Sequence, residues 1–372
     1  MDIRQKALEL HEFNKGKISV ISKVRVNNEE DLSLAYTPGV AEVCKEIKAN
    51  SNLIYEYTNK SNMVAVITDG SAILGLGNIG SRAGMPVMEG KAVLFKEFAD
   101  IDAFPICLES QNVEDIIFTV KQIAPGFGGI NLEDISAPKC FEIEERLMKE
   151  LDIPVFHDDQ HGTAIVVLAG MINALKLVNK NIEDIRVVIN GAGAAGIAIS
   201  KLLLKSGVND VIVCNSRGIL NPKDNRLDKI RKEVALLTNR KNIKGGLKEA
   251  IRNTDVFIGV SVANVLSEEM VASMNKDGII FAMANPIPEI YPDEARKAGA
   301  KVVGTGRSDF PNQINNVLVF PGIFKGALNV RASKINEEMK LAAAFAISDL
   351  ISDDELNEDY ILPKAFDIRV GE

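Results

Sequence analysis

Two pairs of neighbouring acidic residues have the chemistry needed to hold a metal ion. Glu133 and Asp134 follow a short apolar segment, and Asp158 and Asp159 follow a second one. Carboxylate oxygens suit hard cations such as Mg²⁺ or Mn²⁺, and the ends of strands are common places for such ligands. Neighbouring acids are also frequent on solvated loops, so the spacing by itself leaves a metal site and an ordinary polar loop as alternatives.

Two histidines next to the second acidic pair suggest a different metal. His157 and His161 have the His-x-x-x-His spacing of zinc ligands on a helix. However, Gly162 follows directly, and no glutamate lies between the two histidines. We therefore interpret both as polar or capping side chains with hydrogen-bond partners, and we predict no zinc site.

The segment Gly191-Ala192-Gly193-Ala194-Ala195-Gly196 has the G-x-G-x-x-G spacing of a dinucleotide-binding turn. A buried strand is predicted before it, over residues 185–190, and a helix after it, over residues 197–205. In such a turn the first glycine permits the tight bend, the second lets the backbone approach a pyrophosphate, and the third lets helix and strand pack closely. This context predicts NAD or NADP as cofactor. The alternative is a glycine-rich turn that binds nothing.

The same spacing occurs a second time, in Gly75-Leu76-Gly77-Asn78-Ile79-Gly80. A dinucleotide site needs an uninterrupted helix after the turn, with its N-terminal N–H groups facing the phosphates. Gly84 and Pro86 are expected to break a helix at that place. We therefore interpret this segment as a loop.

The residues after the next strand bear on the choice of coenzyme. NAD-binding folds carry an acid there for the adenosine ribose, whereas this chain has Asn215-Ser216-Arg217. Asn215 removes a charge that would repel a 2′-phosphate, and Arg217 could attract one. A solvated surface arginine is an equal alternative, so the segment favours NADP only slightly.

The wider pattern supplies the elements that position these residues. Buried apolar strands alternating with helices indicate an α/β protein with a parallel, doubly wound sheet. We predict a smaller mixed α/β domain over residues 1–160 and a Rossmann-type domain over residues 161–372. The last ~40 residues are predicted to be helical, and one possible arrangement is that these helices pack back onto the first domain. The predicted strands are residues 63–68, 102–108, 129–132, 155–156, 185–190, 211–214, 256–260, 279–284 and 301–304. The main predicted helices are residues 88–98, 112–124, 138–151, 163–180 and 197–205.

Composition and charge exclude several function classes. The 372 residues are 46% hydrophobic and 25% charged, with a net charge of −8. An acidic chain is a poor general ligand for nucleic acid or anionic membranes, because both need a basic face. No apolar segment approaches the ~20 residues that span a bilayer, and no apolar signal core follows Met1, so a cytoplasmic protein is expected. The four cysteines include no CxxC pair, which predicts neither a disulfide framework nor a thiolate zinc site.

A series of short segments occurs in a defined order along nearly the whole chain. They are Tyr36-Thr37-Pro38-Gly39-Val40, Thr68-Asp69-Gly70, Ile73-Leu74-Gly75-Leu76-Gly77, Glu89-Gly90-Lys91, Glu133-Asp134, Asp158-Asp159-Gln160-His161-Gly162-Thr163-Ala164, Ala284-Asn285-Pro286, Asn315-Asn316 and Phe320-Pro321-Gly322. Together they resemble malic enzyme in its short prokaryotic form. No single segment suffices, but their ordered combination is highly specific.

The resemblance implies oxidation of (S)-malate with reduction of NAD or NADP, decarboxylation of the bound oxaloacetate, and protonation of the enolate to pyruvate. It implies that Lys91 is the base at the C2 hydroxyl, with Asp158 beside it, and that Tyr36 delivers a proton to C3. A free lysine has a pKa of about 10.4, so Lys91 would need a depressed pKa to act near neutral pH. The alternatives are a solvated helix lysine and a tyrosine of the core.

The resemblance also assigns ligands. The implied ligands of Mg²⁺ or Mn²⁺ are Glu133, Asp134 and Asp159. Asn285 and one of Asn315 or Asn316 would hydrogen-bond the malate carboxylates, although asparagine is also common in turns.

The chain departs from the family pattern in one segment. Larger members carry a substrate-contacting arginine where this chain has Ser71 and Ala72. Either Arg82 or backbone groups replace that arginine, or the pocket takes a different anion.

Family members are commonly dimers or tetramers, so the resemblance implies a homo-oligomer acting on a small-molecule substrate. Two other functions remain as alternatives: a 2-hydroxy acid dehydrogenase without decarboxylation, and a dinucleotide-sensing module without turnover. Lys91, Tyr36 and the two acidic pairs argue against the sensing module.

Overall fold

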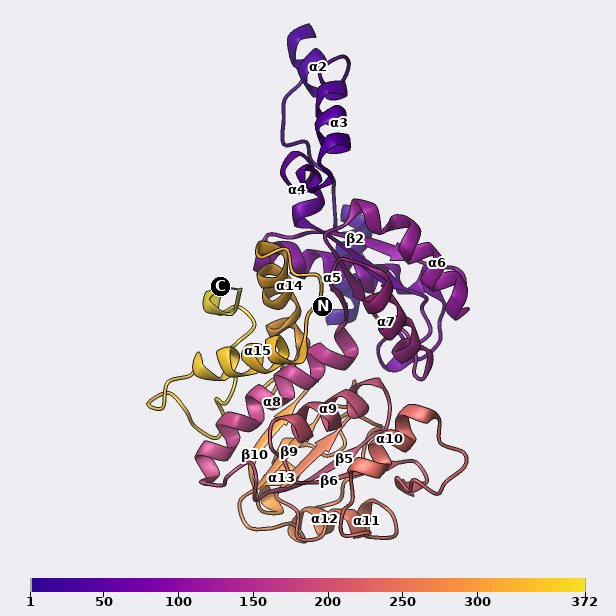
Figure 1. Cartoon of the computed structure of the whole chain (residues 1–372). Coiled ribbons are helices and arrows are strands. Elements are labelled where there is room, and N and C mark those ends of the chain that lie inside the picture. The colour runs from indigo at the N-terminus through magenta and orange to yellow at the C-terminus, as the bar shows by residue number, and fades with distance from the viewer. Residues whose placement is uncertain (1, 372) are drawn as a thin grey trace.

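The computed structural model describes residues 2–371 and contains two sheets, as Figure 1 shows. The first sheet has four parallel strands in the order β2-β1-β3-β4. Its strands are β1 (Met63–Thr68), β2 (Asp102–Cys107), β3 (Gly129–Leu132) and β4 (Val155–His157). Because all four run in one direction, their carboxyl ends meet at one edge of the sheet.

Three helices pack with this sheet: α5 (Ser81–Ala99), α6 (Val113–Ile123) and α7 (Lys139–Glu150). The expectation that Gly84 and Pro86 break a helix is wrong, because α5 begins directly after Gly80 and runs through both residues. Gly84 has a packing role instead, since a Cβ there would lie 2.7 Å from the Ile73 side chain. Glycine thus lets α5 approach the preceding loop closely.

The second sheet has six strands in the order β10-β9-β8-β5-β6-β7, and β7 is antiparallel to the otherwise parallel set. This confirms the predicted doubly wound α/β architecture. Its strands are β5 (Arg186–Asn190), β6 (Asp210–Asn215), β7 (Gly218–Ile219), β8 (Val256–Gly259), β9 (Gly278–Ala282) and β10 (Ala300–Thr305). Its helices are α9 (Ala194–Lys205), α10 (Lys229–Leu237), α11 (Leu247–Ala250), α12 (Glu268–Ala272) and α13 (Pro292–Lys297).

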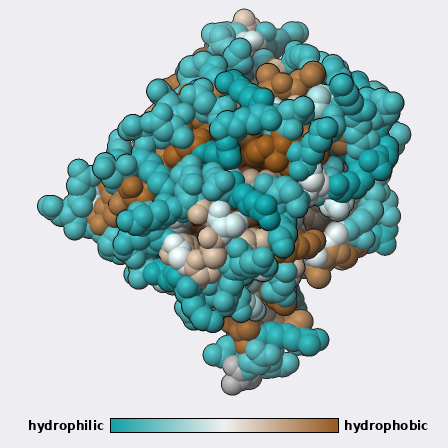
Figure 2. All heavy atoms as spheres, turned by 90° about the horizontal axis from the view of Figure 1, so that it is seen from below, coloured by the Kyte–Doolittle hydropathy of each residue, from teal (hydrophilic) through white to brown (hydrophobic). Residues whose placement is uncertain are grey.

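A long helix, α8 (Asp158–Val178), joins the two sheets (Figure 1). It begins five residues before the predicted start at Thr163, so Asp158 and Asp159 lie in its first turn and not on a loop. By length and composition α8 could cross a membrane, which corrects the expectation that no segment could. Its most apolar stretch is 67% buried inside the protein, as in a core helix. The face seen in Figure 2 is mainly hydrophilic, with separate hydrophobic patches.

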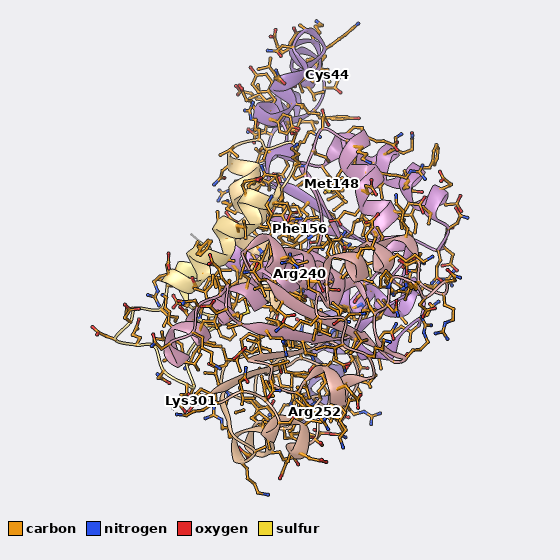
Figure 3. The ribbon with its side chains drawn as sticks, turned by 60° about the horizontal axis from the view of Figure 1, so that its bottom comes forward. Cys44, Met148, Phe156, Arg240, Arg252 and Lys301 are labelled. Carbon is orange, nitrogen blue, oxygen red and sulfur yellow. The ribbon has the colours of Figure 1, made fainter. Side chains whose placement is uncertain are left out.

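The last two helices, α14 (Phe320–Asn329) and α15 (Glu337–Asp349), pack on α5 and α8 respectively. Phe320 and Phe324 of α14 contact the ring of Phe95 on α5, with centroids 4.8 and 5.4 Å away. Phe324 also meets Phe156 of β4, which Figure 3 places in the interior. The chain end after the second sheet therefore covers a helix of the first sheet.

Helices α2, α3 and α4 form an arm that projects from the rest of the protein, with Cys44 near its far end (Figures 1 and 3), whereas the N-terminus lies back in the body of the protein. The arm helices are α2 (Glu29–Ala35), α3 (Val40–Ala49) and α4 (Ile54–Tyr57). The helix before them, α1 (Ile3–Asn14), lies outside the arm, and the Lys17 N–H that follows it donates to Glu89 of α5. Not one of residues 2–59 is buried, although many are apolar. Such a segment has no core of its own to stabilise it.

Candidate active site

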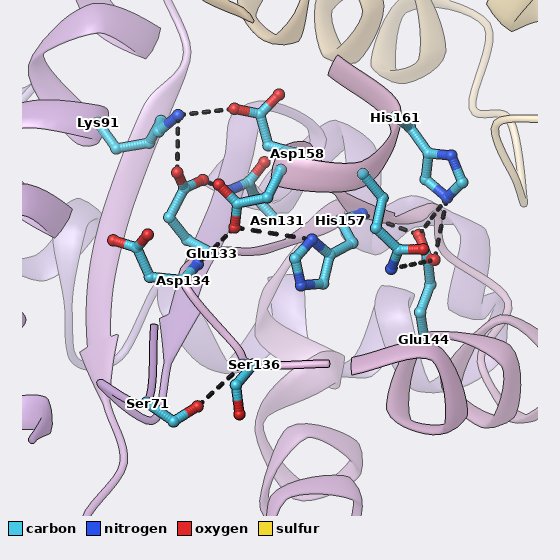
Figure 4. Close-up of polar contacts among 12 residues, drawn as sticks. Ser71, Lys91, Asn131, Glu133, Asp134, Ser136, Glu144, His157, Asp158 and His161 are labelled. Carbon is cyan, nitrogen blue, oxygen red and sulfur yellow. Dashed lines mark hydrogen bonds and ion pairs between the residues drawn. The ribbon is translucent and has the colours of Figure 1, made fainter. Parts of the chain in front are cut away.

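The carboxyl edge of the first sheet gathers a buried lysine and several acids (Figure 4). Glu133 follows β3, Asp158 opens α8 after β4, and Lys91 lies on the buried face of α5. The Lys91 Nζ atom is 2.7 Å from Asp158 Oδ2 and 2.9 Å from Glu133 Oε1. The structure therefore joins Lys91 to both acidic pairs, which come from different strands.

The environment of Lys91 holds its ammonium in the charged form. Burial by itself lowers the pKa of Lys91, but the charges of Asp158 and Glu133 outweigh burial, and the net pKa is raised. The ring of Phe320 lies 4.1 Å from Nζ and also favours the cation. With no cation bound to the acids, Lys91 therefore does not have the depressed pKa that we expected of a base.

Three acids form a cluster suited to a cation. Oxygen atoms of Glu133, Asp134 and Asp159 lie within 4.8 Å of one another. Asp134 Oδ2 is buried and has no hydrogen-bond partner. Burial, followed by the charges of Asp159 and Glu133, raises the pKa of Asp134 to about 9. Without a counter-charge this cluster must bind a proton, so its donor set fits a hard divalent cation.

Two polar side chains support the cluster: Asn131, which the sequence did not single out, and His157, which it offered only as a zinc candidate. Asn131 on β3 donates a 2.8 Å hydrogen bond to Glu133 Oε2. The His157 ring is fully buried, and its Nδ1 lies 3.8 Å from Asp159 Oδ2. The Asp134 backbone N–H also donates to Asp159, at 2.8 Å. Residues behind metal ligands commonly orient them in this way.

The two histidines have separate environments, and they do not meet at a zinc site. His161 Nε2 lies 2.9 Å from the buried carboxylate of Glu144, as expected for a histidine with a polar partner. Both ring nitrogens of His157 have no hydrogen-bond partner among the described residues, which differs from the partnered side chain that we predicted. Among residues 2–371, the His, Cys, Asp and Glu side chains that come close enough together to hold a metal are those of the acidic cluster, Glu133, Asp134 and Asp159.

The three asparagines predicted to bind substrate, Asn285, Asn315 and Asn316, differ in how close they lie to the acidic cluster. Asn285 follows β9, and its carbonyl lies 2.6 Å from the position that a Cβ on Gly75 would take. Asn316 packs against Gly162 in the first turn of α8, beside Asp158. The Asn315 side chain accepts a hydrogen bond from the Val317 N–H, which is a turn role. Asn316 therefore borders the site, Asn285 lies against the loop at Gly75 with its side-chain amide near Gly306, and Asn315 caps the short helix after it.

The segment that departs from the family pattern is held by local hydrogen bonds. Ser71 Oγ donates to Asp69 at 2.6 Å, and the Ala72 N–H donates to the Asp134 carbonyl at 3.0 Å. Arg82 points outward, with 90% of its side chain exposed, and pairs with Glu109. In this chain Arg82 is not placed to replace the missing arginine.

Tyr36 lies away from the buried lysine. It ends α2 on the projecting arm, and 67% of its surface is exposed. Its hydroxyl forms no hydrogen bond with the described residues, and Figure 1 shows the arm directed away from α5. A single copy of this chain thus does not bring Tyr36 to Lys91.

The glycine turn after β5 has the geometry that its sequence predicts. Gly191 has φ +125°, and a Cβ there would lie 2.4 Å from the Val260 carbonyl oxygen. Gly193 faces open space and precedes α9, which begins at Ala194 rather than at residue 197. A Cβ on Gly196 would lie 1.7 Å from the Gly191 carbonyl oxygen, so helix and strand pack too closely for a side chain.

A cavity of about 740 Å³ lies above this turn. It is lined by Gly191, Ala192, Asn215, Ser216 and Arg217 together with residues that the sequence did not reveal: Asn190, Arg226, Arg231 and Ser261. Arg231 of α10 donates from Nε to the Ala192 carbonyl at 2.7 Å. No local pattern could predict this contact, because it joins residues 39 positions apart.

A mainly parallel sheet with a glycine turn and a cavity at the carboxyl ends of its strands is typical of the dinucleotide-binding domains of oxidoreductases. Two family models match the chain: malic enzyme, N-terminal domain, over residues 14–148, and malic enzyme, NAD binding domain, over residues 160–370. Together they span most of its length, and the chain belongs to the malic enzyme family.

Relatives support the same assignment. The bifunctional malic/malolactic enzyme of Bacillus subtilis is 62% identical over 372 residues, covering 100% of this chain and 91% of that protein. The NAD-dependent malic enzyme of Geobacillus stearothermophilus is 58% identical, covering 96% of this chain and 74% of that protein. The crystal structure of malic enzyme from Pyrococcus horikoshii Ot3 is 52% identical, with a TM-score of 0.96, and covers 100% of this chain and 88% of that one.

Proposed function

We propose that this protein catalyses the metal-dependent oxidative decarboxylation of (S)-malate to pyruvate and CO₂, with reduction of NAD or NADP. The observation that carries the proposal is the buried Lys91, which contacts Asp158 and Glu133 at the edge of the acidic cluster. A buried lysine is suited to accepting and returning a proton at a substrate hydroxyl once a cation on the neighbouring acids removes the charge that raises its pKa.

The residues have separate roles in the proposed reaction. Lys91 takes the proton of the C2 hydroxyl while the C2 hydride passes to the nicotinamide, and Asp158 holds the lysine by its 2.7 Å contact. The bond to the C4 carboxylate then breaks and releases CO₂. A proton from the Tyr36 hydroxyl finally reaches C3 to complete pyruvate. Asn285 and Asn316 are proposed to bind the substrate carboxylates.

The proposed cation ligands are Glu133, Asp134 and Asp159, with Mg²⁺ or Mn²⁺ as the ion. When bound, such an ion supplies a Lewis acid at the C2 oxygen of the substrate. It would also compete with Lys91 for Glu133, and this competition would lower the raised pKa of the lysine. The orphaned Asp134 Oδ2 supports a ligand role for that residue.

A product analysis separates oxidative decarboxylation from plain 2-hydroxy acid dehydrogenation. Purified protein is given malate, Mn²⁺ and either coenzyme, and CO₂, pyruvate and oxaloacetate are measured. We expect equal amounts of CO₂, pyruvate and reduced coenzyme, with loss of all three on adding EDTA. Oxaloacetate accumulating without CO₂ would instead support the plain dehydrogenase. Lactate is measured as well, because the Bacillus subtilis relative is named malic/malolactic enzyme.

The coenzyme pocket leaves NAD and NADP as alternatives that one comparison resolves. Asn215 carries no charge, and the Arg217 guanidinium contacts Asp224 at 3.4 Å. Asp224 therefore competes with a 2′-phosphate for this arginine. Steady-state rates with each coenzyme at saturating malate and Mn²⁺ give the preference directly.

We further propose that the protein is a homodimer or tetramer, divided near residue 160 into a substrate domain and a dinucleotide domain, and located in the cytoplasm. Residues 3–34 expose a series of large apolar side chains: Ile3, Leu8, Phe13, Val20, Ile21 and Leu34. Exposed apolar surface of this extent is typical of a subunit interface. A second copy would also supply the Tyr36 that a single chain keeps away from its own Lys91.

Mixing two inactive variants tests this arrangement. If Tyr36 acts in the site of a second copy, Tyr36→Phe and Lys91→Ala protomers unfolded and refolded together form hybrid dimers with one intact site. Random pairing then restores about a quarter of the wild-type activity. Recovery that stays at the level of the separate variants would place both residues in one chain's site.

A further inference from the structure

The helix that carries Asp158 and Asp159 lacks a cap of its own. Its N-cap residue, His157, forms no side-chain hydrogen bond to the first turn. The first N–H groups of a helix have no partner within the helix and must find one elsewhere. The first turn of α8 therefore depends on partners from other elements for its position.

Glu144 of α7 supplies a partner for one of these N–H groups and also binds two side chains of the same segment (Figure 4). Its Oε1 accepts the His157 backbone N–H at 2.9 Å, and its Oε2 accepts the Gln160 side-chain amide at 3.1 Å. Both oxygens lie within 3.0 Å of His161 Nε2. One buried carboxylate thus binds three groups on both sides of Asp158 and Asp159.

The contacts extend to the C-terminal helix α15. Lys340, itself buried, lies 3.1 Å from His161 Nδ1 and 2.8 Å from Glu337. Because the lysine can only donate, Nδ1 accepts and the Nε2–H group donates to Glu144. The orientation of the imidazole is therefore set from both sides, and the first turn of α8 is fixed between α7 and α15.

The charge of Glu144 is maintained in this setting. Burial by itself would raise its pKa, but the hydrogen bond from His161 and the charge of Lys340 oppose burial, and the net pKa of Glu144 is lowered. A carboxylate that stays ionised and accepts three hydrogen bonds is a strong, directional anchor.

We propose that Glu144 is a positioning residue, which anchors the first turn of α8 so that Asp158 faces Lys91 and Asp159 faces the metal cluster. Glu144 touches neither substrate nor reacting atoms; it acts through the backbone of His157 and the side chains of Gln160 and His161. The proposal rests on the proposed function, because it gives Asp159 a metal to bind. Removing a residue behind metal ligands commonly costs 10–100-fold in metal affinity.

The test compares Glu144→Ala and Glu144→Gln with Glu145→Ala, which removes an exposed neighbour that pairs with Lys149 on the same helix. Mn²⁺ and coenzyme affinities are measured by calorimetry. We expect Glu144→Ala to weaken Mn²⁺ binding by about tenfold or more, Glu144→Gln to weaken it less, and Glu145→Ala to leave it unchanged. Coenzyme affinity should stay at the wild-type value in all three, because the glycine turn lies elsewhere.

Hydrogen exchange provides a second readout that does not need a metal. In Glu144→Ala we expect faster exchange at residues 157–162 and wild-type exchange in β5 and α9. Wild-type Mn²⁺ affinity together with unchanged exchange at residues 157–162 would overturn the role of Glu144. If the wild-type protein did not bind Mn²⁺, the proposed function would be contradicted. Hydrogen exchange at residues 157–162 in Glu144→Ala would still show whether Glu144 positions the first turn of α8.

Discussion

Replacing Asp134 by asparagine should stabilise the metal-free protein and remove its response to metal. The oxygens of Asp134, Glu133 and Asp159 lie within 4.8 Å of one another, and Lys91 contacts only Glu133 among them. Two unit charges at that distance would repel by about 3 kcal/mol at an effective dielectric constant of 20. In the metal-free protein this cost appears either as direct repulsion or as the free energy needed to keep a proton on Asp134. The partial exposure of Asp159 reduces the repulsion, so we expect a gain on the order of 2 kcal/mol for Asp134→Asn.

The pH dependence of this gain follows from the raised pKa of Asp134. The folded protein keeps a proton on Asp134 up to about pH 9, whereas the unfolded chain releases it near the ordinary value of 3.8. Raising the pH through that window therefore destabilises the metal-free wild-type protein. The advantage of Asp134→Asn should be small near pH 4 and grow toward pH 9.

Thermal unfolding with and without Mn²⁺ measures both effects. In EDTA at pH 8, Asp134→Asn should raise Tm by roughly 3 °C. Added Mn²⁺ should raise the Tm of the wild-type protein but have little effect on the variant. Asp354→Asn, a change of an exposed acid, is the matched control. A variant that is less stable than the wild type in EDTA, or that keeps the full response to Mn²⁺, would refute this account of the cluster.

Three further variants test separate parts of the site. Lys91→Ala should abolish malate oxidation but leave part of the reduction or decarboxylation of supplied oxaloacetate, as measured in separate assays; near-normal malate turnover would remove Lys91 from the base role. Asp159→Ala should weaken Mn²⁺ binding by about tenfold or more in calorimetry, and unchanged affinity would point to Asp158 as the third ligand. Gly196→Ala should abolish coenzyme binding, because its Cβ would lie 1.7 Å from the Gly191 carbonyl oxygen; wild-type affinity by fluorescence titration would show that the turn does not hold the coenzyme.

The strands and the glycine turn could be predicted because their signals are local. β1 and β3 have the predicted bounds, since each is an apolar run ending at turn residues or acids. The short elements β7 and α11–α13 have too few residues to show a period, and the sequence did not indicate them. The prediction failed for α5, where Gly84 was expected to break the helix. Gly84 is instead required by close packing against Ile73, and residue preferences along the chain do not reveal such a tertiary contact.

The candidate site could be predicted only in part. The acids at strand ends were evident, because parallel strands bring their carboxyl ends to one edge. The position of Lys91 between Asp158 and Glu133 depends on how α5 packs on the sheet, and the family resemblance was the guide to it. Glu144 had no signal, since its partners lie 13–17 positions away on another helix.

Titration of the metal-free protein with Mn²⁺ tests the central proposal most directly. Malate and the preferred coenzyme are present in excess, and reduced coenzyme and CO₂ are followed together. The proposed acidic cluster predicts no turnover without metal, and equal rates of both products that rise until one Mn²⁺ is bound per chain. Full malate oxidation in the absence of Mn²⁺, or coenzyme reduction without CO₂ release at saturating Mn²⁺, would contradict it.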